Sequence, residues 1–476
     1  MNTVVNTTIN DLERVFQKQK VKAIEWRTST AKERIHRLKK LQRYMLSHQK
    51  EIEQALHIDL RKHEVEAVMT EIYVANKEIK ECIKHLKGWM KPKYVSTPLP
   101  LFTTSGKVVY EPKGVSLIIA PWNYPFFLQM GPFVNAIAAG NTAILKPSEM
   151  TPHVSSIVKK IISEVFEEEE AYVAEGGVEV STALLEMPFD HIYFTGSPQV
   201  GKIIMNAAAK NLSSVTLELG GKSPVVVDKK VNQKDAAKKI IWGKLTNMGQ
   251  TCVAPDYLLV HEEIEKEFLD ALQESMQKMY NADGKGIQQA EALSRIVNER
   301  HFDRIVGIIE DAIVKGAEVV CGGTWDRDDL YIAPTILRNV TEDMKVMQEE
   351  IFGPLLPVNT YKTLEEAIEI VDRREKPLAY YIFSKSRRAQ KYLLNHSTAG
   401  STAINETILQ VAHPHLPFGG VNNSGIGKAN GYYSFLEFSN QRSVLKQKVG
   451  LTNMSMLYPP YTPFSATMIN TLKKWF

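Results

Sequence analysis

The feature that most constrains the fold is a regular alternation of apolar runs and helical stretches that begins at residue 115. The runs VSLIIAP, TAILKP, DHIYFTG and SVTLELGG are rich in β-branched residues, and segments with helical spacing separate them. Short, continuous apolar runs of this kind are typical of strands buried on both faces. Because strands that alternate with helices form parallel sheets, the pattern predicts a doubly wound α/β fold.

A second series of the same kind starts near residue 222. It contains the runs SPVVVD, YLLVH, AEVVCGG, LPVNTY and AYYIFS, with helices expected at 234–247, 262–279, 299–315 and 363–371. A chain of 476 residues has room for two to four structural units at roughly 150 residues per domain. We therefore expect two α/β lobes.

Two segments near the N-terminus do not follow this alternation. Residues 8–90 carry apolar side chains at three- and four-residue spacing and are predicted to be helical. A helix is also predicted over 153–166 (HVSSIVKKIISEVF), with Thr151 as its cap. The segment 91–114 is rich in Pro, Thr and β-branched residues. Its composition predicts an extended hairpin that leaves the body of the protein.

Composition excludes several classes of protein. The net charge is +4 without a basic block, which argues against a nucleic-acid partner, and no apolar run has the roughly 20 residues of a membrane span. The N-terminus has no signal-peptide pattern. Cys82, Cys252 and Cys321 lie too far apart for a disulfide framework or a zinc site, and for His413 and His415 we prefer a loop role. We expect no metal site and a cytoplasmic protein.

The segment YFTGSPQVGK has the context of a phosphate-binding turn. Gly196, Ser197 and Gly201 follow a predicted buried strand and open a helix, where backbone N–H groups and the helix N-terminus favour an anion. A plain strand–helix turn explains the glycines equally well. Glu149 stands at a strand end, where an acidic partner for a ribose is expected, although it precedes the glycine turn.

Seven separated segments point to one family. They are, in order, APWNYPF, LKPSE, FTGSPQVG, LELGGKSP, GQTCVAP, EEIFGP and LPFGGVNNSGIGK. From about residue 10 to 445 the chain resembles the NAD(P)-dependent aldehyde dehydrogenase superfamily. Finer features, such as WGKLTNMGQTCVAPDY and MQEEIFGPLLP, resemble its class 3 and fatty aldehyde dehydrogenase branch.

The resemblance implies a mechanism. Cys252 matches the nucleophile that forms a thiohemiacetal, the side-chain amide of Asn123 and the backbone N–H of Cys252 match the oxyanion donors, and Glu218 matches the base that activates water to hydrolyse a thioester. Each residue also has a simpler interpretation: Cys252 as a core residue, Glu218 in an ion pair, Asn123 in a turn. The motifs favour the catalytic interpretation of all three.

The resemblance also implies a dinucleotide site for NAD, with NADP as the alternative. Lys146 and Glu149 match contacts to the adenosine ribose, and Glu350 matches a contact to the nicotinamide ribose. The further residues assigned to this site are Trp122, Gly196, Ser197, Gly201, Leu219, Gly220 and Phe352.

The expected architecture follows from the family. It is aldehyde dehydrogenase-like, with two Rossmann-like α/β lobes and a β arm for bridging and oligomerisation. Because an exposed strand edge needs a partner and class 3 relatives are dimers, we expect a homodimer. The predicted units are a cofactor lobe at 1–90 and 113–218, a catalytic lobe at 221–410, an arm at 91–112 and 411–447, and a tail at 448–476.

The tail has an amphipathic pattern. Lys473 and Lys474 lie on one helical face, and on another lie Phe464, Met468, Ile469, Leu472, Trp475 and Phe476. Three interpretations remain open: a cap on the substrate funnel, as in fatty aldehyde dehydrogenases, a peripheral contact with a membrane, or packing against the partner subunit.

The first two interpretations of the tail favour a long apolar substrate, a fatty or polyene (carotenoid-type) aldehyde. An aromatic or medium-chain aldehyde is the alternative. A CoA-acylating enzyme would dispense with Glu218, and a non-catalytic relative would lose Cys252 or Asn123. Because all three residues are present, we favour a hydrolytic aldehyde dehydrogenase.

Overall fold

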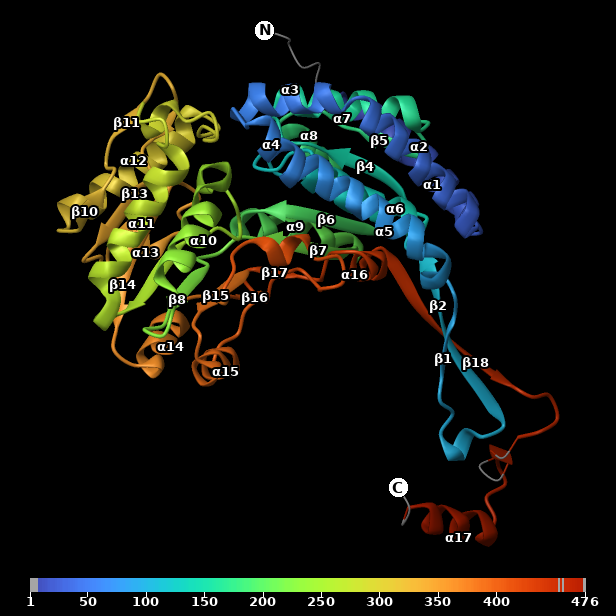
Figure 1. Ribbon diagram of the computed structural model, residues 1–476. Helices are drawn as coiled ribbons and strands as arrows, with labels where there is room; N and C mark the ends of the chain where they lie inside the picture. The colour runs from blue at the N-terminus through green and yellow to red at the C-terminus, as the bar shows by residue number, and fades with distance from the viewer. Residues whose placement is uncertain (1–6, 453, 456–457, 474–476) are drawn as a thin grey trace.

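The computed structural model describes residues 7–452, 454–455 and 458–473, which form two α/β lobes and a long projecting arm (Figure 1). The first lobe is built on a six-stranded sheet of order β17-β7-β6-β3-β4-β5. All neighbours are parallel except β17 and β7. Its strands are β3 (Val115–Ile119), β4 (Thr142–Lys146), β5 (Ala171–Val173), β6 (His191–Gly196), β7 (Ser214–Leu219) and β17 (Gly425–Ile426).

Helices cover this sheet and confirm the predicted helical N-terminus. They are α1 (Ile9–Trp26), α2 (Ala31–Ser47), α3 (Gln49–Leu60), α4 (Glu64–Ala67), the π-helical turn η1 (Val68–Ile72), α5 (Tyr73–Trp89), α6 (Phe127–Ala139), α7 (Pro152–Val165), α8 (Val178–Leu185), α9 (Pro198–Asn211) and α16 (Tyr432–Glu437).

One predicted helix cap is wrong. Thr151 is at the N-cap position of α7, but its side chain makes no capping hydrogen bond. The Asp59 carboxylate accepts hydrogen bonds instead, from the backbone N–H of His153 at 3.4 Å and of Val154 at 2.9 Å. A carboxylate is the stronger partner because it also opposes the positive end of the helix dipole.

The second lobe contains a seven-stranded sheet of order β10-β13-β14-β9-β8-β15-β16. The strands β13 and β16 were missed in the sequence, and β10 runs antiparallel to β13, against the predicted parallel pattern. The chain enters β13 from the short hairpin β11–β12 (Trp325–Asp326 and Tyr331–Ile332) rather than from a crossover helix, so the pair can be antiparallel. The strands are β8 (Pro224–Val227), β9 (Tyr257–His261), β10 (Glu318–Cys321), β13 (Thr335–Arg338), β14 (Leu355–Tyr361), β15 (Ala379–Phe383) and β16 (Ser401–Ile404).

Six helices flank the second sheet in the described chain. Four lie near the positions predicted: α10 (Gln233–Leu245), α11 (Glu265–Tyr280), α12 (Glu299–Val314) and α14 (Leu364–Asp372). The helices α13 (Lys345–Gln348) and α15 (Arg387–Asn395) were not predicted. The strands β8, β9 and β15 are fully buried, and one large apolar cluster surrounds them. The first sheet is packed between two other clusters, one of which includes α2, α5, α6 and α7.

The arm is a three-stranded antiparallel sheet that extends away from both lobes (Figure 1). It comprises β1 (Lys93–Val95), β2 (Thr104–Pro112) and β18 (Ser439–Gln447), and β18 pairs with β2 along its whole length. Of the range 411–447 assigned to the arm, only β18 projects, since β17 joins the first sheet and α16 packs against α6. The exact limits of the predicted domains remain predictions.

The tail carries the helix α17 (Pro463–Leu472), as its periodicity predicts. This helix lies beyond the far end of the arm, away from both lobes (Figure 1). Lys474, Trp475 and Phe476 of the predicted amphipathic pattern lie outside the described residues. Within the described part of the chain, no helix combines the length and the apolar character needed to cross a membrane.

Candidate active site

The loop 246–252, which leads to Cys252, has an unusual backbone. Asn247, Met248 and Gly249 all have positive φ, at 51°, 55° and 75°. For a residue other than glycine, this conformation costs about 1–2 kcal/mol. Gly249 also lies at a close approach, because a Cβ there would be 2.3 Å from the carbonyl oxygen of Gly353. The loop is thus packed directly against the EEIFGP segment.

Gln250 is buried and fixes this loop from within. Its side-chain nitrogen donates to the carbonyl oxygens of Asn247 at 3.1 Å and Arg295 at 3.0 Å. Its side-chain oxygen accepts from the backbone N–H of Val297 at 3.1 Å. These bonds satisfy a buried amide, and they hold the strained turn in a single conformation.

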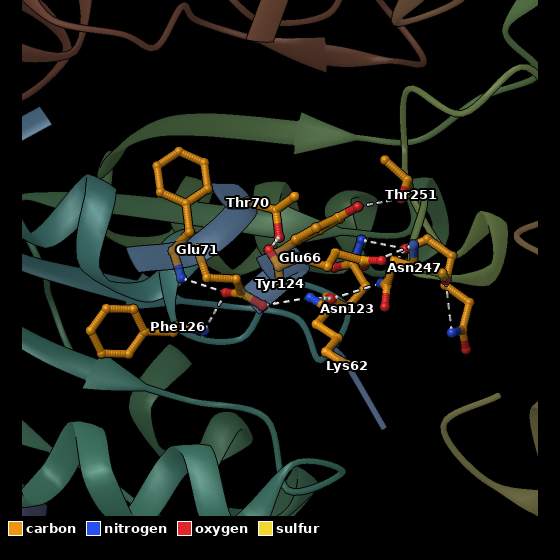
Figure 2. A network of polar contacts seen from close by, with 11 residues as sticks. Lys62, Glu66, Thr70, Glu71, Asn123, Tyr124, Phe126, Asn247 and Thr251 are labelled. Carbon is orange, nitrogen blue, oxygen red and sulfur yellow. Dashed lines mark hydrogen bonds and ion pairs between the residues drawn. The ribbon is translucent and has the colours of Figure 1, made fainter. Parts of the chain in front are cut away.

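Asn123 lies directly against the same loop, although 129 positions separate it from Cys252 in the sequence. Its Nδ2 donates to the carbonyl oxygen of Gln250 at 3.0 Å, and its own carbonyl oxygen accepts from Nδ2 of Asn247 at 2.8 Å (Figure 2). The next residue, Tyr124, places its hydroxyl 2.7 Å from Oγ1 of Thr251. The predicted oxyanion donor and nucleophile therefore belong to one hydrogen-bonded unit.

Glu218 is near the carboxyl end of β7, between Thr195 of β6 and Gly425 of β17. Its side chain is buried, and Oε1 accepts a long hydrogen bond of 3.5 Å from the hydroxyl of Tyr193. Oε2 has no hydrogen-bond partner among the described residues. Burial raises the pKa of Glu218 to about 8, because the charged form is poorly solvated there.

Cys252 is half-buried, and its surroundings oppose ionisation. Burial first, and then the carboxylates of Glu350 and Glu218, raise the pKa of its thiol to about 12. At neutral pH the thiol is protonated, so its attack on a substrate requires a base. Because their charges act on the thiol, Glu350 and Glu218 lie in the neighbourhood of Cys252.

Residues predicted to hold the nicotinamide end also come together. A Cβ on Gly220 would lie 2.2 Å from a carboxylate oxygen of Glu350, so only glycine fits there. Burial and, next, Asp256 raise the pKa of Glu350 to about 8. The ring of Trp122 packs edge-on against Phe352, with 5.4 Å between the centroids.

The predicted phosphate turn lies between β6 and α9. The Ser197 hydroxyl caps α9 by accepting a backbone N–H three residues on at 3.4 Å. A Cβ on Gly196 would lie 2.4 Å from the ring of Phe194, and one on Gly201 would lie 2.8 Å from the side chain of Leu219. Local packing therefore already requires both glycines, and the 14-residue helix α9 begins where an anion would be favoured.

Lys146 and Glu149 lie at the carboxyl end of β4. The Lys146 side chain is buried, and its Nζ donates to the carbonyl oxygen of Pro147 at 2.8 Å and lies 3.6 Å from a carboxylate oxygen of the exposed Glu149. Burial lowers the pKa of Lys146. The pair presents one cation and one hydrogen-bond acceptor at a sheet edge where α/β proteins bind nucleotides.

Comparison with known proteins decides the family. A model described as the aldehyde dehydrogenase family matches residues 1–444. The chain belongs to this family. Among curated relatives, the 4,4'-diaponeurosporen-aldehyde dehydrogenase of Staphylococcus aureus is 46% identical over 458 residues, which cover 96% of this chain and 97% of the relative.

Two solved structures show the same aldehyde dehydrogenase fold. The substrate-bound state of Staphylococcus aureus AldH superposes with a TM-score of 0.92 at 44% identity, covering 97% of this chain and 99% of that one. A betaine aldehyde dehydrogenase of the same species, in complex with NAD⁺, has a TM-score of 0.83 at 27% identity and covers 94% and 90%. This protein is thus an aldehyde dehydrogenase: it oxidises an aldehyde to a carboxylic acid with a nicotinamide cofactor.

The residues of this aldehyde dehydrogenase fit such a cofactor. At Gly196, Gly201 and Gly220 a Cβ would come within 2.8 Å of a neighbouring side chain, and the glycines leave the backbone accessible. The donor set also matches, with a helix N-terminus for phosphates, and with Glu149 and Glu350 as acceptors for ribose hydroxyls. Among the described residues, no group of three or more His, Cys, Asp or Glu side chains could hold a metal ion.

Three residues at the site of this aldehyde dehydrogenase were missed in the sequence. His301 packs on the ring of Trp122, with 4.9 Å between centroids, and burial lowers its pKa to about 4. Lys62 and Glu71 lie under Asn123, with both side chains fully buried. None of the three belongs to a motif. Only an unusually strict retention of these side chains among relatives would have pointed to them.

Proposed function

We propose that Cys252 is the nucleophile of this aldehyde dehydrogenase, that Asn123 donates to the oxyanion, and that Glu218 is the base. One observation carries the proposal: the Asn123 side chain is hydrogen-bonded to Gln250, two residues before Cys252. Its Nδ2 has a second N–H, which remains for a substrate oxygen. The three residues come from segments that are far apart in the sequence and that the fold brings to the loop before Cys252.

The chemistry begins with addition to the aldehyde carbon. A base takes the thiol proton as Sγ of Cys252 bonds to that carbon, and the carbonyl oxygen becomes an oxyanion. The oxyanion accepts hydrogen bonds from Nδ2 of Asn123 and the backbone N–H of Cys252. The product is a tetrahedral thiohemiacetal, from which a hydride leaves far more readily than from a free aldehyde. Glu350 and Gly220 would hold the nicotinamide ring of the cofactor, which would supply the hydride acceptor.

The second half of the reaction is hydrolysis of the thioester left on Cys252. As a carboxylate, Glu218 takes a proton from water, and the resulting hydroxide attacks the acyl carbon. Its partnerless Oε2 is free to accept that proton. The departing thiolate recovers a proton, because burial strongly favours the neutral form of Cys252.

For the substrate, we propose a long apolar aldehyde of the fatty or polyene class. The support is the 46% identity, over nearly the whole chain, to a relative named for a polyene aldehyde. An aromatic or medium-chain aldehyde is the alternative. For the cofactor, we propose NAD, because the exposed carboxylate of Glu149 would bind a ribose 2′-hydroxyl and repel a 2′-phosphate.

For the assembly, we propose a homodimer in the cytoplasm, with peripheral membrane contact through the tail as a further possibility. The arm supports a dimer, since β18 is an edge strand whose side chains are mostly exposed. Because α17 lies beyond the arm, it does not cover the active site of its own chain, and a cap would act on a partner. The three free cysteines suit a reducing compartment.

The roles are tested by two substitutions. Cys252→Ala should lower kcat for aldehyde oxidation by at least about 10³-fold while NADH still binds, as measured by fluorescence titration. Glu218→Gln should retain a rapid first turnover in stopped-flow, followed by slow steady-state release of acid. Turnover of pure Cys252→Ala protein at a rate close to that of the unchanged protein would remove the nucleophile assignment.

The substrate class is tested by a series of aldehydes. We expect kcat/KM to rise by up to about fourfold for each methylene buried, between butanal and long-chain aldehydes, and to be high for a polyene aldehyde. Benzaldehyde is the matched comparison for the aromatic alternative, and each substrate is measured with NAD and NADP. A kcat/KM that does not change with chain length would exclude the long-chain proposal. The same series is repeated after deletion of 462–476, and any change in kcat/KM is the contribution of the tail.

A further inference from the structure

A fully buried ion pair lies beneath the loop that carries Asn123. Lys62 follows α3, and Glu71 lies on the π-helical turn η1. Both side chains have 0% exposure, and Nζ of Lys62 is 2.6 Å from Oε1 of Glu71. Because burying two charges costs about as much as their attraction returns, stability alone is a weak reason for such a pair.

The other side-chain hydrogen bonds that the described residues make with the pair go to the segment 123–127 (Figure 2). Lys62 donates from Nζ to the carbonyl oxygen of Asn123 at 3.0 Å, and the same ammonium is 4.0 Å from the ring centroid of Tyr124. Glu71 accepts through Oε2 from the backbone N–H of Phe126 at 3.0 Å and of Phe127 at 2.9 Å. The pair therefore holds both ends of a short segment that begins at Asn123.

The carbonyl oxygen of Asn123 is the point where this pair meets the nucleophile loop. It accepts from Lys62 on one side and from Nδ2 of Asn247 on the other, at 3.0 and 2.8 Å. The backbone N–H of Asn247 in turn donates to Oε1 of Glu66 at 2.9 Å. Both sides of the oxyanion site are thus tied to the segment between α3 and η1.

We propose that Lys62 and Glu71 are positioning residues for the oxyanion site: their ion pair fixes the Asn123 backbone, so that the side-chain amide points at the oxygen of the substrate. The proposal rests on the roles proposed above for Asn123 and Cys252. Neither residue of the pair touches the reacting atoms. Their effect is therefore exerted on the formation of the bond to Cys252, and not on cofactor binding.

The test is the rate at which Cys252 is acylated by p-nitrophenyl acetate in the absence of cofactor. This reaction needs the thiol, a base that takes its proton and the oxyanion donors, but no cofactor. We expect Lys62→Met and Glu71→Gln to slow acylation by about 10- to 100-fold, approaching the loss of a donor in Asn123→Ala. The Kd for NAD should stay within about twofold, since the side-chain hydrogen bonds of the pair go to 123–127 and not to a residue assigned to the cofactor.

A double-mutant cycle separates positioning from general stability. If the pair acts through Asn123, then Lys62→Met should cause little further loss in an Asn123→Ala background. An equal loss in both backgrounds would overturn the proposal, as would an unchanged acylation rate in Lys62→Met and Glu71→Gln. Glu71→Gln keeps the shape of the side chain and serves as the second variant should Lys62→Met fail to fold.

Lys159→Met is the matched control. Lys159 forms an ion pair of the same 2.6 Å length with Glu175, but it lies on α7, outside the network around Asn123. Its substitution should leave acylation unchanged. If instead Asn123→Ala itself acylates at the normal rate, the role proposed for Asn123 fails. That result is distinct from a failure of the pair to act through it.

Discussion

At the scale of single residues, the site is defined by ionisable groups that burial keeps neutral. The pKa of Cys252 is raised to about 12, and those of Glu218 and Glu350 to about 8. A protonated thiol is a poor nucleophile, and a protonated carboxyl group cannot accept a proton. Both halves of the reaction are therefore expected to accelerate as the pH rises.

This expectation is sharpest for Glu218. Its carboxyl group is mostly protonated below pH 8, so deacylation of an acetylated enzyme should rise up to about tenfold per pH unit and level off above about pH 8. The measurement is single-turnover acetate release between about pH 6 and 10. In Glu218→Gln the plateau should disappear and leave only the slow, continuous rise due to hydroxide. A plateau that survives in Glu218→Gln would assign the titration to another group.

Candidate catalytic residues could be named from the sequence, but the residues that support them in the fold could not. Cys252, Asn123 and Glu218 lie in motifs whose residue types already carry the chemistry, and the structure gathers them around one loop. Lys62 and Glu71 look like ordinary surface charges of a helical stretch. They are buried only because the segment around η1 packs against 123–127, which is a tertiary contact that periodicity does not encode.

At the scale of elements, the most demanding piece is the strained turn before Cys252. Gly249 combines a φ of 75° with a close approach to Gly353, so a side chain there is penalised twice. We expect Gly249→Ala to destabilise the protein by about 1–2 kcal/mol or more and to lower kcat by about 10²-fold, because the loop moves. Chemical denaturation and steady-state kinetics measure the two effects.

Gly307→Ala is the matched control for this prediction. Gly307 lies within α12, and a Cβ there would meet nothing within 4 Å. Since alanine is the better helix former, this variant should be stabilised by up to about 1 kcal/mol with unchanged kcat. Equal behaviour of the two variants would show that the turn tolerates a side chain.

The helices and strands could be predicted where the spacing of apolar residues within one segment determines them. The buried parallel strands and the long helices follow from apolar spacing. The reversed direction of β10 and the cap of α7 by Asp59 do not, since each depends on a partner distant in the sequence. Thr151 has the right residue type for a cap, but a carboxylate from another helix takes its place.

At the scale of the whole molecule, the arm is the feature that a single chain does not explain. Tyr94, Leu99, Phe102 and Leu445 are 64–81% exposed on it. We expect Leu445→Lys to weaken the proposed dimer by at least about tenfold in Kd, as measured by analytical ultracentrifugation. Val314→Lys, at a still more exposed apolar site on a lobe, should not change the assembly. A wild-type protein that sediments at 53.7 kDa would contradict the dimer.

The bonds around Asn123 also limit how the enzyme can move. Asn123 follows a strand of the first sheet, whereas Asn247 and Gln250 follow a helix of the second lobe. The hydrogen bonds of Asn123 to Gln250 and Asn247 therefore join the two lobes at the proposed catalytic site. A hinge opening that separated the lobes at this point would dismantle the oxyanion site. We therefore expect the cofactor to exchange while the two lobes stay joined at Asn123, without a hinge opening at this point.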